Sequence, residues 1–270
     1  MALTDKLTAI ANAIRTKTGG TDSLTLDQMA SEISNIQSGG ATEPYIEEVY
    51  DSDGELIDVV MYGHTKIRDY AFHNCSSLAS ISLPTGITSI GDSAFNGCTK
   101  LALTSLPNSI TSIGINAFYR CNKLALTSLP NGIDSIKDYA FSGCNNLALT
   151  SLPNSITSID DNVFNGCNSL ALTSLPNSIT SIGRNAFQHC YDLAITSIPS
   201  SVATIEYYAF RNCTNLTSIT FEGTPTLIRS DSFSGCTNLT TINVPWSEGA
   251  VSGAPWGATN ATINYDYTGV

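Results

Sequence analysis

Long hydrophobic runs are missing from this sequence, because nowhere do about 18 apolar residues follow one another. A helix needs roughly 20 such residues to cross a bilayer, so we expect no transmembrane segment. The opening stretch, residues 1–20, also lacks a continuous apolar core and a small-residue cleavage site. The sequence therefore predicts neither membrane insertion nor a signal peptide.

Basic residues and histidines are scarce. The chain has 12 Lys+Arg against 23 Asp+Glu, which gives a net charge of −11. This excess of negative charge disfavours nucleic acid and anionic membrane surfaces as partners. Its three histidines, His64, His73 and His189, stand in no motif with a nucleophile or with metal ligands. We therefore predict that the protein is not an enzyme and uses no cofactor or metal.

Cysteine occurs in one register only. Eight cysteines stand 23 residues apart, from Cys75 to Cys236, and none lies elsewhere. Zinc needs ligands that converge on one point, with spacings such as C-x2-C, and a ladder of this period does not provide that. Disulfides and free thiols both remain open. Free thiols packed as small hydrophobic side chains are favoured, because each cysteine has two equivalent neighbours in such a ladder.

The period of 23 residues organises far more than cysteine. Phe stands three residues before each Cys, Ile eight before, and Leu three after. A fixed period of 20–50 residues is typical of a solenoid, in which each coil buries its apolar residues by stacking on its neighbours. The sequence thus predicts a β-rich solenoid of about eight 23-residue coils.

Within each coil we expect three segments. A short strand such as LALTSLP is followed by an extended stretch such as NSITSI, and then by the segment A-F-x-x-C, which we predict as a 3₁₀ or short α turn. Four middle repeats carry LALTSLP, where the apolar register shifts by one residue. That shift predicts a bulge or a bent strand there.

Four domains follow from these patterns. Residues 1–37 carry two apolar stripes at helical spacing and are predicted to be a helical segment for attachment or oligomerisation. Residues 38–61 form a linker and a capping β-hairpin, and residues 62–245 form the solenoid. Residues 246–270 hold both tryptophans, Trp246 and Trp256, and are predicted to break the period as a C-terminal cap. A sugar-binding platform is the alternative for this tryptophan pair.

Differences between the repeats gather beside A-F-x-x-C, whereas LALTSLPNSITSI recurs almost unchanged. Tyr and Arg are enriched at interface hot spots. If the protein has a specific ligand, we expect it along this ridge, whose candidate residues are Tyr119, Arg120, Tyr139, Arg184, His189, Tyr191, Tyr207, Tyr208 and Arg211. Neutral drift at exposed positions is the alternative explanation. The sheet face, with small Ala, Ser and Thr side chains, is a flatter alternative surface for weak glycan contacts.

The pattern I-x-x-I-G-x-x-A-F-x-x-C-x-x-L, over residues 65–245, resembles the BspA-like, or Treponema pallidum-type, leucine-rich repeat. This resemblance implies a curved leucine-rich repeat solenoid that binds proteins or surfaces without catalytic machinery. The two ends, DKLTAIANAIRTKTGG and NVPWSEGAVSGAPWGATNATINYDY, are similar to segments of phage tail-fibre and baseplate-associated proteins of Gram-positive hosts.

That second resemblance implies a receptor-binding component of a phage virion, which contacts a bacterial surface protein or glycan. Residues 1–37 would then hold other phage tail proteins or a second copy of the chain. A bacterial BspA-like protein of the cell surface or cytoplasm, encoded in a prophage region, is the alternative. A secreted adhesin of that kind would need a signal peptide, which we do not expect here.

Overall fold

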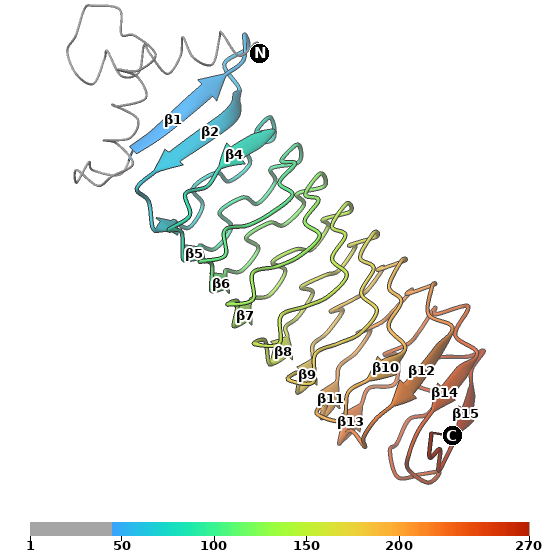
Figure 1. The fold of residues 1–270 in the computed structure, drawn as a ribbon. Coiled ribbons are helices and arrows are strands. Elements are labelled where there is room, and N and C mark those ends of the chain that lie inside the picture. Colours follow the sequence, from blue (N-terminus) through green and yellow to red (C-terminus); the bar gives the residue numbers. More distant parts are fainter. Residues whose placement is uncertain (1–44, 270) are drawn as a thin grey trace, which may run out of the picture. The chain divides into compact units, whose positions relative to one another are not determined.

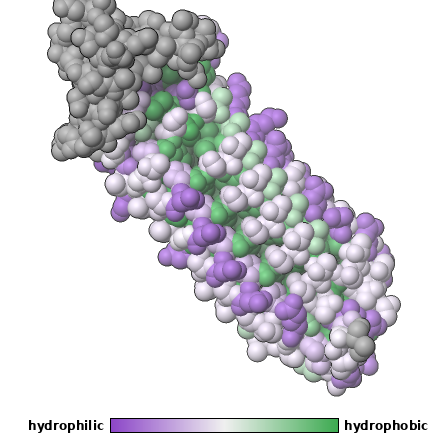
Figure 2. Space-filling model, viewed as in Figure 1, coloured by the Kyte–Doolittle hydropathy of each residue, from purple (hydrophilic) through white to green (hydrophobic). Residues whose placement is uncertain are grey.

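The 23-residue period becomes a stack of coils in the computed structural model, which describes residues 45–269 (Figure 1). The predicted helices of residues 1–37 lie outside the described residues. Within residues 45–269 the coils lie side by side, and each repeats the path of the one before it (Figure 1). Hydrophilic residues recur from coil to coil on the face shown in Figure 2.

A parallel ladder of two-residue strands runs along the stack. Each strand places one half-buried or exposed residue before a buried Ile, as expected for the two-residue alternation of a strand. Neighbouring strands pair in parallel at an offset of 23 residues. They form two four-stranded sheets: β3 (Lys66–Ile67), β5 (Ser89–Ile90), β6 (Ser112–Ile113) and β7 (Ser135–Ile136), then β8 (Ser158–Ile159), β9 (Ser181–Ile182), β11 (Thr204–Ile205) and β13 (Leu227–Ile228).

A second ladder is formed only at the two ends of the stack. Its strands are β4 (Ser80–Ser82) near the N-terminal end, and β10 (Ser197–Ile198), β12 (Ser218–Phe221), β14 (Thr241–Asn243) and β15 (Thr262–Asn264) near the C-terminal end. In the four middle repeats the LALTSLP segment is extended but forms no strand.

The missing strands have a physical cause. In β12 the buried Ile219 and Phe221 stand two residues apart, which suits a strand. In a middle repeat the buried pair is Leu126 and Leu129, three residues apart, and a strand cannot turn both side chains inward. One backbone bond still joins such coils, for example from Ala125 N–H to the Leu103 carbonyl at 3.0 Å. Instead of the predicted bulge or bent strand, these repeats contain an irregular extended segment.

The A-F-x-x-C segment is a chain of tight turns with the hydrogen bonds of a 3₁₀ turn, and it forms neither an α turn nor a helix. Bonds from residue i+3 back to residue i are present, such as Cys98 N–H to the Phe95 carbonyl at 3.1 Å. Two residues per coil, such as Ser93 (φ 53°) and Gly97 (φ 78°), are left-handed, which a right-handed helix cannot include. The described residues contain no helix.

Phenylalanine and cysteine form the centre of the stack. From Phe72 to Phe233 the eight rings stack on one another, with centroids 5.1 to 5.8 Å apart. All eight cysteines are free thiols, and all but Cys75 are buried. Each buried thiol donates a hydrogen bond to the Phe carbonyl of the preceding coil, as Cys144 Sγ does to Phe118 at 3.0 Å. The cysteines therefore satisfy buried carbonyls as well as filling space, which the sequence reading did not foresee.

The N-terminal end of the stack is covered by a hairpin. β1 (Tyr45–Tyr50) and β2 (Leu56–Tyr62) form an antiparallel pair. β2 also pairs in parallel with β4, the first strand of the second ladder. The Asp51 carboxylate accepts the backbone N–H groups of Asp53 and Glu55, at 3.0 and 2.9 Å, and so closes the turn between the strands.

At the other end the strict period breaks as predicted, although one more turn follows: β15 pairs with β14 at an offset of 21 residues instead of 23. Trp256 follows Phe233 by 23 residues, and Val251 follows Ile228 by the same interval. The Trp256 carbonyl accepts the Phe233 N–H at 2.9 Å, whereas in the earlier coils the accepting carbonyl stands 22 residues after the Phe, as Ala117 does for Phe95. A ninth turn is therefore present, and its Trp256 ring packs on Phe221 and Trp246. Both tryptophans are buried, at 6% exposure for Trp246 and 0% for Trp256, so they cap the core and present no platform for a sugar.

Candidate functional site

The nine predicted site residues lie on the turns that follow β6, β7, β9 and β11, which belong to the ladder of two-residue strands. None of them is buried. Two properties of these turns decide what the side chains can do: the backbone conformation at each position, and the contacts between neighbouring coils.

Each of these turns has two left-handed positions. The first stands two residues before Phe and is occupied along the stack by Tyr70, Ser93, Asn116, Tyr139, Asn162, Asn185 and Tyr208. The second stands two residues after Phe and is occupied by Asn74, Gly97, Arg120, Gly143, Gly166, His189, Asn212 and Gly235. Gly adopts this conformation freely and Asn tolerates it, whereas other side chains are strained by roughly 1–2 kcal/mol. Taken together, most of these left-handed positions are thus occupied by Asn or Gly.

The exceptions are four of the predicted site residues, together with Tyr70 and Ser93. Arg120 in one coil is followed by Tyr139 in the next, and His189 in one coil is followed by Tyr208 in the next. Both pairs therefore place a left-handed cation or imidazole in one coil and a left-handed tyrosine in the next. The sequence reading missed Tyr70, although it occupies the repeat position of Tyr139 and Tyr208 and is 64% exposed.

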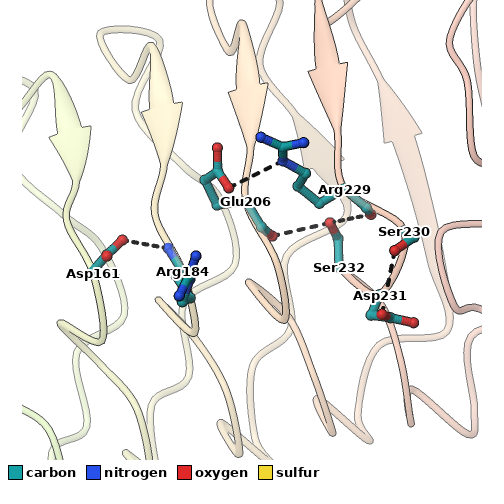
Figure 3. A network of polar contacts seen from close by, with 7 residues as sticks. All are labelled: Asp161, Arg184, Glu206, Arg229, Ser230, Asp231 and Ser232. Atoms are coloured by element: carbon teal, nitrogen blue, oxygen red, sulfur yellow. Dashed lines mark hydrogen bonds and ion pairs between the residues drawn. The ribbon is translucent and has the colours of Figure 1, made fainter.

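Seven side chains over three successive coils form what we call the Tyr207 group: Arg184, His189, Tyr191, Tyr207, Tyr208, Arg211 and Arg229. The guanidinium carbons of Arg184 and Arg229 lie 5.9 and 5.0 Å from the centre of the Tyr207 ring. Arg211 lies 5.1 Å from the Tyr208 ring, and the two tyrosine rings are 6.4 Å apart. Arg229, absent from the predicted set, also pairs with Glu206 at 3.4 Å (Figure 3).

His189 joins this group through its ring nitrogens. Nδ1 lies 3.2 Å from the Tyr191 hydroxyl and 3.3 Å from the Asn212 amide nitrogen. Partial burial and the nearby positive charge of Arg211 both lower the pKa of His189. The imidazole is therefore neutral at pH 7 and can accept a hydrogen bond at this position.

A smaller set, the Tyr119 group, comprises Tyr119, Arg120 and Tyr139. The Arg120 guanidinium lies 5.1 Å from the Tyr119 ring, which meets the Tyr139 ring edge-on at 6.5 Å. The coil between the two groups has Asp161, Asn162 and Gly166 at the corresponding positions, without aromatic or cationic side chains. The structure thus divides the predicted ridge into two groups.

The family of the chain follows from its repeat. The sequence pattern of the BspA type leucine rich repeat region matches residues 65–194 and 149–251, which together span more than half of the chain. The chain belongs to the BspA-type leucine-rich repeat family. This match confirms the predicted leucine-rich repeat solenoid, and repeats of this type form binding scaffolds. The matched residues leave out both ends of the chain.

A solved leucine-rich repeat structure shares this fold. The leucine-rich repeat protein of T. pallidum is 28% identical, with a TM-score of 0.51, over 72% of this chain and 88% of that chain. A leucine rich cell surface protein of Faecalibacterium prausnitzii is 21% identical, with a TM-score of 0.46, over 76% of this chain and 83% of that chain. None of the curated proteins matches this chain.

Some variable positions of these BspA-type repeats serve the scaffold. The Asp161 carboxylate accepts the backbone N–H of Arg184 at 2.6 Å, and so fixes the turn that carries this arginine (Figure 3). Asp92 accepts the Ile115 N–H in the same way at 2.7 Å. These aspartates are therefore inter-coil links, and their position in the ridge does not make them ligand contacts.

Residues 45–269 contain no group of three or more His, Cys, Asp and Glu side chains that could hold a metal ion. Over the same residues, no helix is long and apolar enough to cross a membrane.

Proposed function

We propose that this protein is a non-enzymatic binding protein whose ridge contacts a protein or glycan on a bacterial surface. One observation carries the proposal: Arg120 and His189 stand at a left-handed position where the other six coils place Asn or Gly, and each is followed in the next coil by a left-handed tyrosine, Tyr139 or Tyr208. Residues in strained conformations persist where the side chain has a use that offsets the strain. Drift at exposed positions does not explain why these residues occur as pairs in adjacent coils.

The ridge also fits binding in its composition. Tyr and Arg dominate interface hot spots, and the Tyr207 group combines three tyrosines with three arginines. The alternative sheet face presents Ala, Ser and Thr side chains such as Thr150 and Ser151, which are exposed but small. We therefore place the principal contact on the ridge.

We further propose that the protein acts in a phage tail fibre or baseplate, as part of the virion. The similarity of its two ends to tail-associated segments supports this role, and residues 1–37 would bind tail proteins or a second copy. A bacterial BspA-like surface or interaction protein is the alternative, supported by the family match. Neighbouring genes for tape-measure, baseplate or holin proteins would favour the phage role, and their absence would favour the alternative.

Cell binding tests the ridge. Fluorescently labelled protein should bind candidate host cells, and the double variant Tyr207→Ala/Tyr208→Ala should bind at least about tenfold more weakly, as expected when two hot-spot tyrosines are removed. The matched control is Thr150→Ala/Thr173→Ala on the exposed side of two LALTSLP segments, which should leave binding unchanged. Equal binding by the tyrosine variant, or a loss in the control alone, would reject the ridge as the contact surface.

A further inference from the structure

Two arginines of the Tyr207 group have no acidic partner. Within residues 45–269 the one ion pair joins Arg229 to Glu206, so no carboxylate of these residues lies within 4.0 Å of the guanidinium groups of Arg184 and Arg211. The only polar contact of Arg184 in Figure 3 uses its backbone nitrogen. Eight of the nine basic residues in this range have no carboxylate partner, so these two arginines are distinguished by the rings they lie on and not by being unpaired. Their N–H groups remain available to a ligand outside the chain.

The tyrosine rings hold these guanidinium groups in place. Arg184 lies over Tyr207, and Arg211 lies over Tyr208. Stacking on a ring uses the flat face of a guanidinium and leaves its N–H edge free. That edge matches a carboxylate or a phosphate through two parallel hydrogen bonds. Because the rings already restrict the arginines, little further order is lost when an anion binds.

The remaining surface of the group is polar. The hydroxyls of Tyr207 and Tyr208 have no hydrogen-bond partner among the described residues, and the neutral ring of His189 contacts Tyr191 and Asn212. The group itself consists of aromatic, cationic and imidazole side chains, all of which carry polar atoms. A ligand rich in hydroxyl groups can satisfy these donors and acceptors.

The order of the residues also suits a chain-like ligand. Arg184 and Tyr207 occupy the same repeat position in successive coils, and Arg211 lies in the coil of Tyr207. A ligand that runs along the stack therefore meets Arg184 first and Arg211 one coil later. Its acidic groups would recur along its length, as they do in a polymer with an acid in each repeat unit.

We propose that the Tyr207 group binds an anionic polysaccharide, with Arg184 and Arg211 contacting its acidic groups and the tyrosine hydroxyls contacting its sugar hydroxyls. This inference rests on the proposed function and specifies the ligand class for it. The chemistry fits both a uronate and a sugar phosphate, so the probes must distinguish these two.

Direct binding to purified polymers tests the inference. The full chain is titrated by calorimetry with polygalacturonate, poly(glycerol phosphate), neutral dextran and polyglutamate, at low and at physiological salt. We expect one of the two anionic glycan-type polymers to bind, with affinity falling as salt rises, since its charges are screened. The double variant Arg184→Gln/Arg211→Gln should lose at least about tenfold in affinity, as for the removal of one or more charged contacts.

The matched control is Lys100→Gln/Lys123→Gln, which makes the same change in net charge at two exposed lysines outside the group. It should bind as the unchanged protein does. Equal losses in both variants would show that the binding is nonspecific and would overturn the inference. Equal affinity for dextran, or preference for polyglutamate, would overturn it as well.

Failure of this inference can be told apart from failure of the proposed function. If the protein binds cells through Tyr207 and Tyr208 but binds neither anionic polymer, the ligand class is wrong and the ridge remains the contact surface. If it binds neither cells nor polymers, both proposals fail.

Discussion

At left-handed positions on the ridge, the backbone conformation favours Gly or Asn, whereas binding at the surface favours a larger side chain. Gly143 and Gly166 satisfy the backbone, because a left-handed φ of 77° or 74° causes them no strain. Arg120 occupies the same position with φ 58° and contributes a cation stacked on Tyr119. A residue kept for its surface chemistry at such a position should lower stability, and its replacement should raise stability.

Arg120→Asn tests this trade-off. Asn74 and Asn212 already occupy the same repeat position, so the variant should fold and gain about 0.5–1 kcal/mol in free energy of unfolding, since Asn tolerates a left-handed φ. Urea unfolding measures the change. The control is Gly166→Ala, where an added Cβ meets nothing closer than 3.7 Å, so that only the backbone strain of about 1–2 kcal/mol is introduced. A destabilised Arg120→Asn would show that Arg120 serves the scaffold.

The residue types in the sequence indicate which positions are left-handed. Six of the eight residues at the second left-handed position are Gly or Asn: Asn74, Gly97, Gly143, Gly166, Asn212 and Gly235. That preference indicates a left-handed backbone rather than the predicted helical turn. The contacts of Arg229 could not be predicted in this way, because they depend on which side chains meet across neighbouring coils.

Among the structural elements, the thiol ladder follows most directly from the sequence, and its chemistry is the part that the sequence does not show. The equal spacing of the cysteines predicts that they lie in one register on neighbouring coils. It does not reveal that each buried thiol donates to a Phe carbonyl 26 residues earlier, as Cys98 does to Phe72. Similarly, a three-residue spacing of buried leucines predicts an irregular register, but it does not determine whether a bulge forms or the strand is lost.

The buried thiols should make the fold sensitive to alkaline pH. Burial raises the pKa of Cys98 and Cys236 to about 12, and burial is also the main cause that raises the pKa of Cys144. Below about pH 8.5 the thiols are protonated in both the folded and the unfolded chain, so their contribution to stability is fully present. Above that pH the unfolded chain releases protons that the folded chain retains, and stability falls as the pH rises toward the folded pKa.

Urea unfolding at pH 7, 9 and 10 measures this loss for the unchanged protein and for Cys144→Ala. The variant should be less stable at pH 7, because it loses a hydrogen bond and leaves a small cavity. The difference between the two proteins should then shrink by about 1.4 kcal/mol for each pH unit above 8.5, since one titrating thiol is missing. A difference that stays constant with pH would show that Cys144 ionises as readily in the folded state as in the unfolded state.

On the scale of the whole stack, each coil is stabilised mainly by its two neighbours, so the last coils are the most exposed to unfolding. The sequence predicts the interior of this array because every coil there repeats the same residues. It predicts the C-terminal end poorly, because Trp256 replaces Phe and Thr259 stands where the next Cys would be. Only the 23-residue intervals from Ile228 to Val251 and from Phe233 to Trp256 indicate a ninth turn, whose strand then pairs at an offset of 21 residues.

Trp256→Ala should therefore open the C-terminal end of the stack and leave the middle intact. Trp256 is fully buried, and its removal should cost about 3–5 kcal/mol. Because the ninth turn contacts only the eighth coil, this loss should expose Cys236 to a thiol-specific reagent, while Cys144 in the middle stays protected. Mass spectrometry of labelled peptides locates the reacted thiols, and Tyr191→Ala at the exposed surface is the control that should leave both unreacted. Equal labelling of Cys236 and Cys144 would show that the stack unfolds as a single unit and that the ninth turn has no separate capping role.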